Sequence, residues 1–339
     1  MKTLFQQLPP TVFFLDSHNL DSLSEYLQRR GWLRESERVV AATQAGEGNM
    51  NCVLRVRTSD RSIILKQARP WVEKYPHIPA PWDRALIEGR FYQLIGTRPT
   101  LAQRMPRLLG FDPDAHLLMF EDLGEAQDFT VLYQGGEIGY EELDALLQYL
   151  VELHLAFRRS DATLSFENRA MRELNHEHIF VVPFRADNGV NLDTITPGLE
   201  AVATQLRADV PCMTTVSELG KLYLEQGDAL VHGDYFPGSW LRTASGIRIL
   251  DPEFCFVGPP EFDLSVLIAH LYLSQQPEAL VQHSLDQYQS QGRLNVPLTQ
   301  QFAGVEIMRR LLGVAQLPLP YGLQSKAALL DLSRSLVLL

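Results

Sequence analysis

The sequence predicts an α+β fold made of two lobes, and three observations support this prediction. A chain of 339 residues is longer than a single hydrophobic core usually covers. Its first third contains short β-like runs separated by polar turns, whereas helical periodicity dominates the remainder. We therefore expect an N-terminal lobe over residues 1–121 with an antiparallel five-stranded sheet and a helix, followed by a larger, mainly helical C-terminal lobe over residues 122–339.

The N-terminal lobe is predicted from its hydrophobic spacing. Leu20, Leu23 and Leu27 recur at helical intervals up to Trp32, and a second helix is expected from about Trp82 to Ile95. The expected strands alternate or are continuously apolar, and their order favours a meander. They are the runs ERVVAATQ, NCVLRVRT, SIILKQA, RLLGFD and HLLMF.

The C-terminal lobe begins after the exposed connector EDLGE at residues 121–125. A helix is predicted from Tyr140 to about Arg158, and residues 165–200 are predicted to be irregular. Further helices are expected over 199–207 and 216–226, then from Leu264 to the C-terminus. Between them lie two short strands, ALV and IRIL, joined through Gly246.

Composition excludes several classes of function. A net charge of -11 is unfavourable for sequence-independent binding to DNA or RNA, so no nucleic-acid partner is expected. Cys52, Cys212 and Cys255 have neither disulfide nor metal-ligand spacing, which indicates packing roles in a reducing compartment. No apolar run has the length of a signal-peptide core or a membrane span, so we expect a cytoplasmic protein without a membrane partner.

Three carboxylates, those of Asp234, Asp251 and Glu253, occur in one largely apolar segment. This segment is VHGDYFPGSWLRTASGIRILDPEF, residues 231–254. Asp251 precedes Pro252, which favours an extended backbone and would place Asp251 and Glu253 on one side of the chain. Two such carboxylates suit Mg²⁺, which takes its other ligands from water and phosphate. Asp234 follows Gly233, whose freedom permits a tight bend, so it is predicted to act as a separate acid near the metal.

The N-terminal lobe contains the complementary parts of a phosphate site. Gly46, Gly48 and Asn49 form a turn able to present backbone N–H groups to phosphate oxygens. Lys66 ends the third expected strand and could reach the α/β-phosphates, and Glu88 on the following helix could hold that lysine. Carboxylates holding magnesium, together with a further aspartate as proton acceptor, are what phosphoryl transfer requires.

The order of these parts resembles the protein-kinase-like fold of the aminoglycoside and choline kinases, and the local sequence is most similar to the methylthioribose kinases. The similarity extends from about Gly46 to Ala315. It rests on GEGNMN, SIILKQA, DRALIEGRF, MFEDL, NHEHIFVVPF, HGDYFPGS, DPEFCFVGPPEFD and MRRLLGVA, which occur in family order.

The resemblance implies an ATP- and Mg²⁺-dependent kinase for a small-molecule hydroxyl, with the sugar methylthioribose as the leading acceptor. It also implies specific roles for eight positions. The catalytic base would be Asp234, the metal ligands Asp251, Glu253 and Ser239, the adenine contacts the backbone of Glu121 and Leu123, and the substrate contacts Arg309 and Arg310.

This sequence also departs from the family pattern. After HGD, the family's Leu-His-Thr-Gly-Ser is replaced by Tyr235, Phe236, Pro237, Gly238 and Ser239, so Tyr235 is expected either to line the acceptor pocket or to pack in the core. An aminoglycoside or amino-alcohol acceptor, and an inactive nucleotide-binding protein of the same fold, remain alternatives. ATP and the acceptor are the expected partners, and a homodimer is left open.

Three residues have structural interpretations. We expect His232 to brace its loop through a hydrogen bond and His154 to be a core histidine with its hydrogen bonds satisfied. Asp263 is expected to order the loop by accepting backbone N–H groups. For Arg309 and Arg310, adjacent positions diverge by about 100° around a helix, so contact with one common ligand is a demanding expectation.

Overall fold

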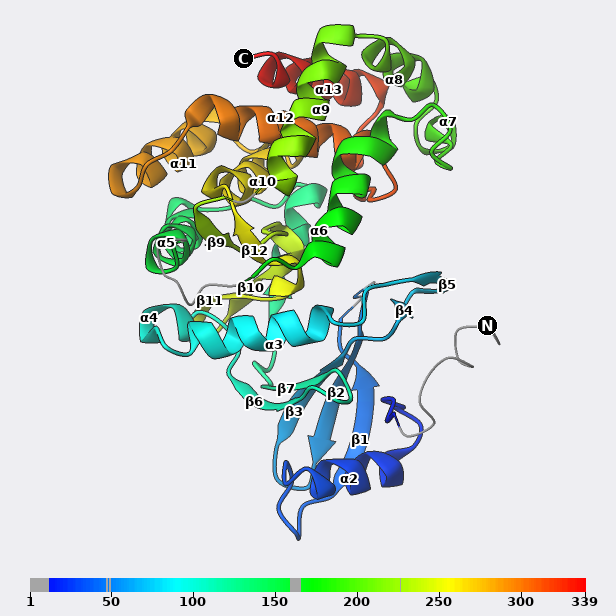
Figure 1. Cartoon of the computed structure of the whole chain (residues 1–339), viewed down its shortest axis with the longest axis vertical. Helices are drawn as coiled ribbons and strands as arrows, with labels where there is room; N and C mark the ends of the chain where they lie inside the picture. The colour runs from blue at the N-terminus through cyan, green and yellow to red at the C-terminus, as the bar shows by residue number, and fades with distance from the viewer. Residues whose placement is uncertain (1–11, 47, 49, 159–165, 226) are drawn as a thin grey trace. The chain divides into compact units, whose positions relative to one another are not determined.

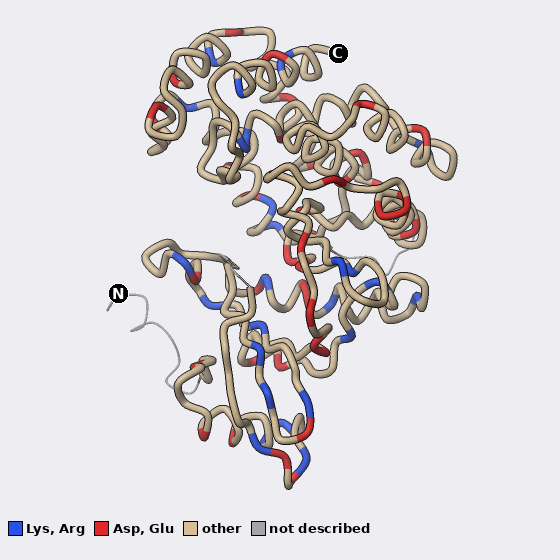
Figure 2. Tube along the Cα trace, turned by 180° about the vertical axis from the view of Figure 1, so that it is seen from behind, with Lys and Arg blue, Asp and Glu red and all other residues tan. Residues whose placement is uncertain are grey.

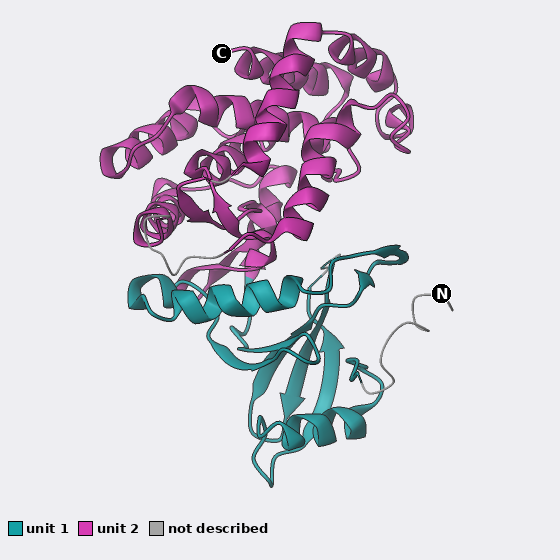
Figure 3. Cartoon of the chain, in the orientation of Figure 1, with its two compact units in different colours: residues 1–126 teal, residues 127–339 magenta. Residues whose placement is uncertain are grey.

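The computed structural model describes residues 12–46, 48, 50–158, 166–225 and 227–339. The chain forms two compact units, Met1–Ala126 and Gln127–Leu339, drawn in teal and magenta in Figure 3. The division follows Ala126, whereas the lobe boundary predicted from sequence follows Glu121. Figure 2 shows that Lys and Arg, in blue, and Asp and Glu, in red, are both distributed along much of the chain.

Unit 1 contains the predicted five-stranded antiparallel sheet, in the order β1-β2-β3-β7-β6. Each predicted run contains one strand, so this part of the fold prediction is confirmed. The strands are β1 (Val39–Gln44), β2 (Cys52–Thr58), β3 (Ser62–Gln67), β6 (Leu108–Asp112) and β7 (Leu117–Glu121).

Two helices cover opposite faces of this sheet (Figure 1). Helix α2 (Leu20–Arg29) begins where the Asn19 side chain accepts the N–H of Ser22, and it buries Leu23 and Leu27. These leucines share a core with alternate residues of β7, Leu117 and Met119. On the other face, helix α3 (Arg84–Ile95) places Tyr92 against Phe120.

The segment between β3 and α3 contains a short hairpin that periodicity did not predict. Strand β4 (Trp71–Val72) pairs with β5 (Tyr75–Pro79) within a proline-rich stretch. Prolines suit an edge because the missing N–H is not needed there. A short helix, α4 (Pro99–Ala102), follows α3.

Unit 2 is mainly helical, as predicted. Helices α10 and α12 contact each other, and almost every residue of α10 after its first turn is buried. The helices are α5 (Tyr140–Ala156), α6 (Arg169–His176), α7 (Leu192–Ile195), α8 (Leu199–Arg207), α9 (Val210–Leu224), α10 (Pro260–Leu273), α11 (Glu278–Gln291), α12 (Val296–Leu312) and α13 (Leu323–Val337).

The prediction that residues 165–200 are irregular is wrong for much of the described part. Helix α6 continues into a π-helical turn at Glu177–Val181 and a 3₁₀ turn at Val182–Phe184, and α7 follows. The helical period is hidden because α6 buries the polar residues Arg172 and Asn175 beside a single large apolar residue.

The two short strands predicted from the sequence, ALV and IRIL, are present, and they belong to different sheets. Strand β9 (Ala229–Val231) pairs with β12 (Phe256–Gly258), whereas β11 (Gly246–Ile249) pairs with β10 (Trp240–Thr243) in a separate sheet. Strand β8 (Gln127–Asp128) completes that second sheet. Strands of three or four residues contain too few alternations for sequence to identify their partners.

The packing role predicted for the cysteines is confirmed, because Cys52, Cys212 and Cys255 are all buried. Burial raises the pKa of the Cys52 and Cys212 thiols to about 11, so these side chains behave as small apolar groups. In the described part of the chain, no helix combines the length and apolar character needed to cross a bilayer.

Candidate active site

The loop after β9 positions Asp234 through the backbone of the two residues before it. Asp263, in the first turn of α10, accepts the N–H of His232 at 2.6 Å with Oδ2 and the N–H of Gly233 at 2.9 Å with Oδ1. Asp263 is fully buried. The expectation that Asp263 orders this loop is therefore confirmed.

His154 supports Asp263 from the opposite side. Its Nε2 lies 3.1 Å from Asp263 Oδ2, and its Nδ1 lies 2.7 Å from the Tyr288 hydroxyl. Because the carboxylate only accepts, Nε2 is the donor in the first contact. His154 is thus a buried histidine with both ring nitrogens bonded, as predicted.

The Asp234 loop is joined to the Asp251 turn by close backbone packing. Gly233 has φ +86°, and a Cβ at this position would lie 2.1 Å from the carbonyl oxygen of Phe254. The His232 ring donates from Nε2 to the Leu250 carbonyl at 2.8 Å, which confirms its predicted bracing role. Leu250 N–H in turn donates to Ser239 O at 2.9 Å. Only glycine permits the close approach of residue 233 to the Phe254 carbonyl, because a side chain at residue 233 would push the Asp251 turn away.

The predicted extended geometry around Asp251 is wrong. Asp251 has φ 60° and ψ 51°, and a 3₁₀ turn at Pro252–Phe254 follows. Proline disfavours the right-handed helical region at the preceding residue, and Asp is one of the few residues other than glycine that adopt the left-handed region. Asn168 holds the turn by donating to the carbonyls of Glu253 at 2.8 Å and Cys255 at 2.9 Å.

Asp251 is exposed, whereas Glu253 is only 6% exposed. Asp234 and Asp251 both act electrostatically on the buried His232 ring, so the two carboxylates border the same loop. The Ser239 hydroxyl donates to the backbone carbonyl of Asp234 at 3.0 Å. Within the described residues, no group of three or more His, Cys, Asp or Glu side chains could hold a metal ion.

Two arginines from α12 lie beside Asp234. Arg310 Nη2 is 3.7 Å from Asp234 Oδ1, and the Arg310 guanidinium stacks over Phe236, 5.0 Å from the ring centroid. Arg309 Nη2 lies 3.4 Å from Asn175 Oδ1, and Asn175 Nδ2 lies 3.4 Å from the Gly233 carbonyl. Burial raises the pKa of Asp234, and the charges of Arg310 and Arg309 oppose that shift.

Both arginines bind one buried carboxylate that sequence reasoning missed. Glu306 Oε1 accepts Arg310 Nε at 2.6 Å, and Glu306 Oε2 accepts Arg309 Nη1 at 3.1 Å. Arg309 and Arg310 project in different directions around α12, yet both bind the side chain of Glu306, which lies one turn earlier in the helix. The spacing of Glu306 three and four residues before the arginines is the signal that could have identified it.

The sequence left two positions open for Tyr235, the wall of the acceptor pocket and the core, and the structure places it in the core. It is fully buried, its hydroxyl donates to the Leu146 carbonyl at 3.1 Å, and its ring stacks with Tyr149. Its proposed place in the acceptor-pocket wall is therefore corrected to a packing role. The neighbouring aromatic residue, Phe236, is partly exposed, and its ring faces the Arg310 guanidinium.

In unit 1, the predicted pair of Lys66 and Glu88 is present. Lys66 Nζ lies 2.7 Å from Glu88 Oε2, and the two side chains are 6% and 2% exposed. Because both side chains are buried, this pair is not an ordinary surface salt bridge. Among the predicted turn residues, Gly46 has φ +71° and open space around its Cβ position. Gly48 is among the residues that the structure describes, whereas Asn49 lies outside them.

The predicted adenine contacts lie at the end of β7. Glu121 N–H donates to Arg107 O at 3.0 Å, and Leu123 is partly exposed two residues further. Between them, Asp122 accepts the Ser62 hydroxyl at 2.6 Å and the Gly124 N–H at 3.0 Å. This connector therefore has a defined backbone, which a backbone-mediated contact requires.

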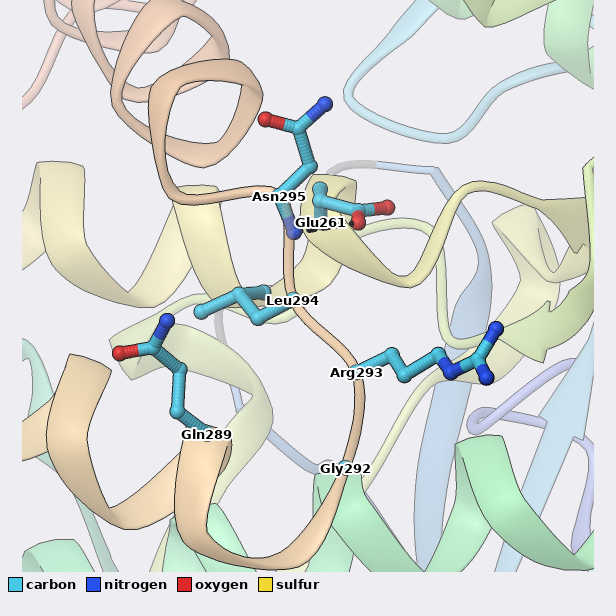
Figure 4. Close-up of a pocket in the computed structure, with 6 residues that line it drawn as sticks. All are labelled: Glu261, Gln289, Gly292, Arg293, Leu294 and Asn295. Carbon is cyan, nitrogen blue, oxygen red and sulfur yellow. Dashed lines mark hydrogen bonds between the residues drawn. The ribbon is translucent and has the colours of Figure 1, made fainter.

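A separate surface pocket lies where α11 joins α12 (Figure 4). Asn295 N–H donates to Glu261 there at 3.0 Å, and the pocket includes no residue predicted from sequence to bind ATP, metal or acceptor. Its lining residues are Glu261, Gln289, Gly292, Arg293, Leu294 and Asn295.

The fold is that of known small-molecule kinases. It is similar to the choline kinase LicA from Streptococcus pneumoniae, with a TM-score of 0.55 over 95% of this chain and 99% of that one at 14% identity. It is also similar to a spectinomycin phosphotransferase solved with ADP and spectinomycin. The TM-score is 0.51 over 94% of this chain and 98% of that one, at 15% identity.

The chain belongs to the Phosphotransferase enzyme family, whose model matches residues 41–297. A methylthioribose kinase from Exiguobacterium sibiricum is 28% identical over 253 residues, which are 70% of this chain. The match covers 62% of that kinase, so the chain aligns with less than two thirds of the relative's length. The family resemblance inferred from the sequence motifs is thereby confirmed.

Proposed function

We propose that this protein is an ATP-dependent kinase that phosphorylates a hydroxyl group of a small molecule, with methylthioribose or a related sugar as the acceptor. The observation that carries the proposal is the contact between the Asp234 loop and the Asp251 turn at Gly233. It brings the loop of Asp234, the proposed proton acceptor, next to the turn of Asp251 and Glu253, the proposed metal ligands. Family membership and the buried Lys66–Glu88 pair support the same reaction.

In the proposed reaction, Asp234 orients the acceptor hydroxyl and takes its proton. The hydroxyl oxygen forms a bond to the γ-phosphorus of ATP, the bond from that phosphorus to the β–γ bridging oxygen breaks, and ADP leaves. Lys66 neutralises charge on the α/β-phosphates, and Glu88 holds its ammonium. Gly46, Gly48 and Asn49 contact phosphate, and the backbone of Glu121 and Leu123 contacts adenine.

Asp251 and Glu253 are the proposed magnesium ligands, because their carboxylates are the donor type that Mg²⁺ prefers. Asp251 is exposed to ligands from solvent, and Glu253 adds a second carboxylate on the same 3₁₀ turn. With two carboxylates, the remaining positions suit water and phosphate oxygens, which Mg²⁺ prefers to a closed protein cage. Ser239, whose hydroxyl donates to Asp234 O, keeps lone pairs for a ligand role. When bound, the ion supplies positive charge against the triphosphate.

The donors beside Asp234 suit a neutral sugar. Arg309 and Arg310, with Glu306 as their common counter-ion, place guanidinium N–H groups near its carboxylate, where they can donate to sugar hydroxyls. An ammonium group, which only donates, would find no acceptor among these N–H groups. In the described part of the chain, Arg310 Nη2 is buried without a hydrogen-bond partner. It therefore provides a donor for an oxygen of the acceptor or of the transferred phosphoryl group.

The test is ADP release with ATP, Mg²⁺ and a panel of methylthioribose, ribose, choline and spectinomycin. We expect turnover with methylthioribose and none with the cationic compounds. Asp234→Asn should abolish turnover while leaving ATP affinity by calorimetry within about twofold, because an amide cannot take the proton. Asp331→Asn on the exposed face of α13 is the matched control.

Asp251→Ala examines the metal ligands separately. We expect it to lower Mg²⁺-dependent ATP affinity by at least about tenfold, since one of two carboxylate ligands is lost. Parental turnover in Asp234→Asn would remove Asp234 as the base. Unchanged ATP affinity in Asp251→Ala would remove the metal assignment.

A further inference from the structure

Glu306 lies at the centre of a buried cluster that joins three elements of unit 2. It is on α12 and 2% exposed. Its carboxylate receives Arg310 Nε and Arg309 Nη1 from one side and His270 Nε2, on α10, at 3.3 Å from the other. Tyr133, in the 3₁₀ turn Phe129–Gln134, contacts His270 Nδ1 at 2.7 Å.

The donors in this cluster can be assigned from chemistry. Burial lowers the pKa of His270 to about 4, so its ring is neutral at pH 7. A carboxylate only accepts, so His270 Nε2–H donates to Glu306 and Nδ1 accepts from the Tyr133 hydroxyl. Burial opposes ionisation of Glu306, but Arg309 and Arg310 outweigh it and hold its pKa well below the usual range.

The hydrogen bonds fix where the Arg310 guanidinium points. Its Nε is bound by Glu306, and its plane rests on Phe236, which directs Nη2 toward Asp234 Oδ1 at 3.7 Å. In the described residues, Arg310 Nη2 and Arg309 Nε are buried without hydrogen-bond partners. A planar guanidinium held at one edge presents its remaining N–H groups in a fixed direction.

We propose that Glu306 is a positioning residue that holds Arg310, and with it Arg309, in the orientation required beside the reacting groups. This inference deepens the proposed kinase function and rests on it. His270 and Tyr133 keep the Glu306 carboxylate in place. A purely structural role would need only a negative charge to compensate the two buried cations, whereas positioning requires the carboxylate at this distance from the helix.

Two substitutions separate charge from position. Glu306→Asp keeps the negative charge but withdraws the carboxylate by one methylene, and Glu306→Gln keeps the length but removes the charge. We expect Glu306→Asp to keep ATP affinity and thermal stability close to the parent. We also expect it to lower kcat by about 100-fold, more than it raises the acceptor KM, because displacement by about 1 Å is enough for such a loss.

Glu200→Asp is the matched control, since Glu200 forms an ion pair with Arg207 at 2.7 Å within α8, a helix that contributes no residue to the cluster. Coupling provides a second measurement. If Glu306 acts through Arg310, Glu306→Asp should change kcat little in an Arg310→Lys background. Parental kcat and KM in Glu306→Asp, or fully additive effects in the double variant, would overturn the proposal.

A spectroscopic measurement tests positioning without catalysis. In protein labelled with ¹⁵N-arginine, the Nε–H resonance of Arg310, assigned by its loss in Arg310→Lys, should be protected from exchange and should shift in both Glu306 variants. The resonance of Arg84, whose Nε donates to Asn51 at 2.9 Å in unit 1, should stay unchanged. An Arg310 signal that is insensitive to both substitutions would overturn the positioning role.

The two proposals fail in distinguishable ways. If the parent protein phosphorylates no acceptor in the panel, the kinase function fails, and the arginine resonances alone decide whether Glu306 positions Arg310. If the parent is active and Glu306→Asp is unimpaired, the kinase function stands and the role of Glu306 fails.

Discussion

The carboxylate of Asp263 accepts the backbone N–H of His232 at 2.6 Å, and this bond anchors the loop that presents Asp234. The neighbouring N–H of Gly233 binds the other carboxylate oxygen. A residue on α10 thus sets the position of the proposed base, although it is far from it in sequence.

Replacement of Asp263 should therefore impair catalysis and stability together. Asp263→Asn leaves one oxygen for two N–H groups and turns an NH₂ toward a donor, so we expect a loss of about 2 kcal/mol in the free energy of unfolding. We also expect kcat to fall by about 100-fold as Asp234 shifts. Urea denaturation and steady-state kinetics measure the two effects, with Asp331→Asn as the exposed control. A parental kcat would contradict the anchoring role.

A methyl group at Gly233 should separate the two loops of the site. Gly233→Ala would meet the Phe254 carbonyl and would also occupy positive φ. Gly31→Ala is the control, since Gly31 has φ +69° but open space around its Cβ position. We expect about 1 kcal/mol of destabilisation for Gly31→Ala and clearly more for Gly233→Ala. Only Gly233→Ala should weaken Mg²⁺-dependent ATP binding by calorimetry, and equal effects would argue against the contact.

Removal of one partner should reveal how strongly Lys66 and Glu88 depend on each other. Lys66→Met takes the ammonium away from the buried Glu88 carboxylate, and we expect it to lower the free energy of unfolding by about 3–5 kcal/mol. Adding Glu88→Leu should recover stability but not ATP affinity, because the phosphate contact is still missing. Lys74→Met, at an exposed position, is the control. Parental ATP affinity in the double variant would remove Lys66 from the nucleotide site.

Stability should decrease as the pH falls below neutrality, and His270 should cause a measurable part of this. Its pKa is about 4 in the folded protein and about 6.5 when unfolded, so the unfolded state binds more protons between these values. The contribution of His270 to stability is therefore fully present above about pH 6.5 and is lost as the pH falls toward 4. From pH 7 to 5 we expect a loss of about 2 kcal/mol from this residue.

His270→Gln should remove that part of the pH dependence. Urea denaturation of both proteins at pH 7 and pH 5 gives the difference directly. Burial also lowers the pKa of His116, His176, His178 and His232, so the variant should keep a smaller dependence of the same sign. An equal pH dependence in parent and variant would show that His270 is not buried in its neutral form.

The sequence by itself determined the strands of unit 1, most helices of unit 2 and the residue types of the proposed site. These features depend on short-range patterns: alternation in the five strands, helical spacing from Tyr140 to Ala156, and acids that follow Gly233 and precede Pro252. The bracing role of His232 could be predicted because a histidine next to a glycine turn has few local partners.

The tertiary structure decided which of these residues meet. The left-handed backbone of Asp251, the pairing of β9 with β12 and the contact of Gly233 with Phe254 arise from packing between distant segments. The convergence of Arg309 and Arg310 on Glu306 depends likewise on His270 and Tyr133 from other elements. Local propensity does not encode such contacts, because a buried charge finds its partner only when the chain removes both from water.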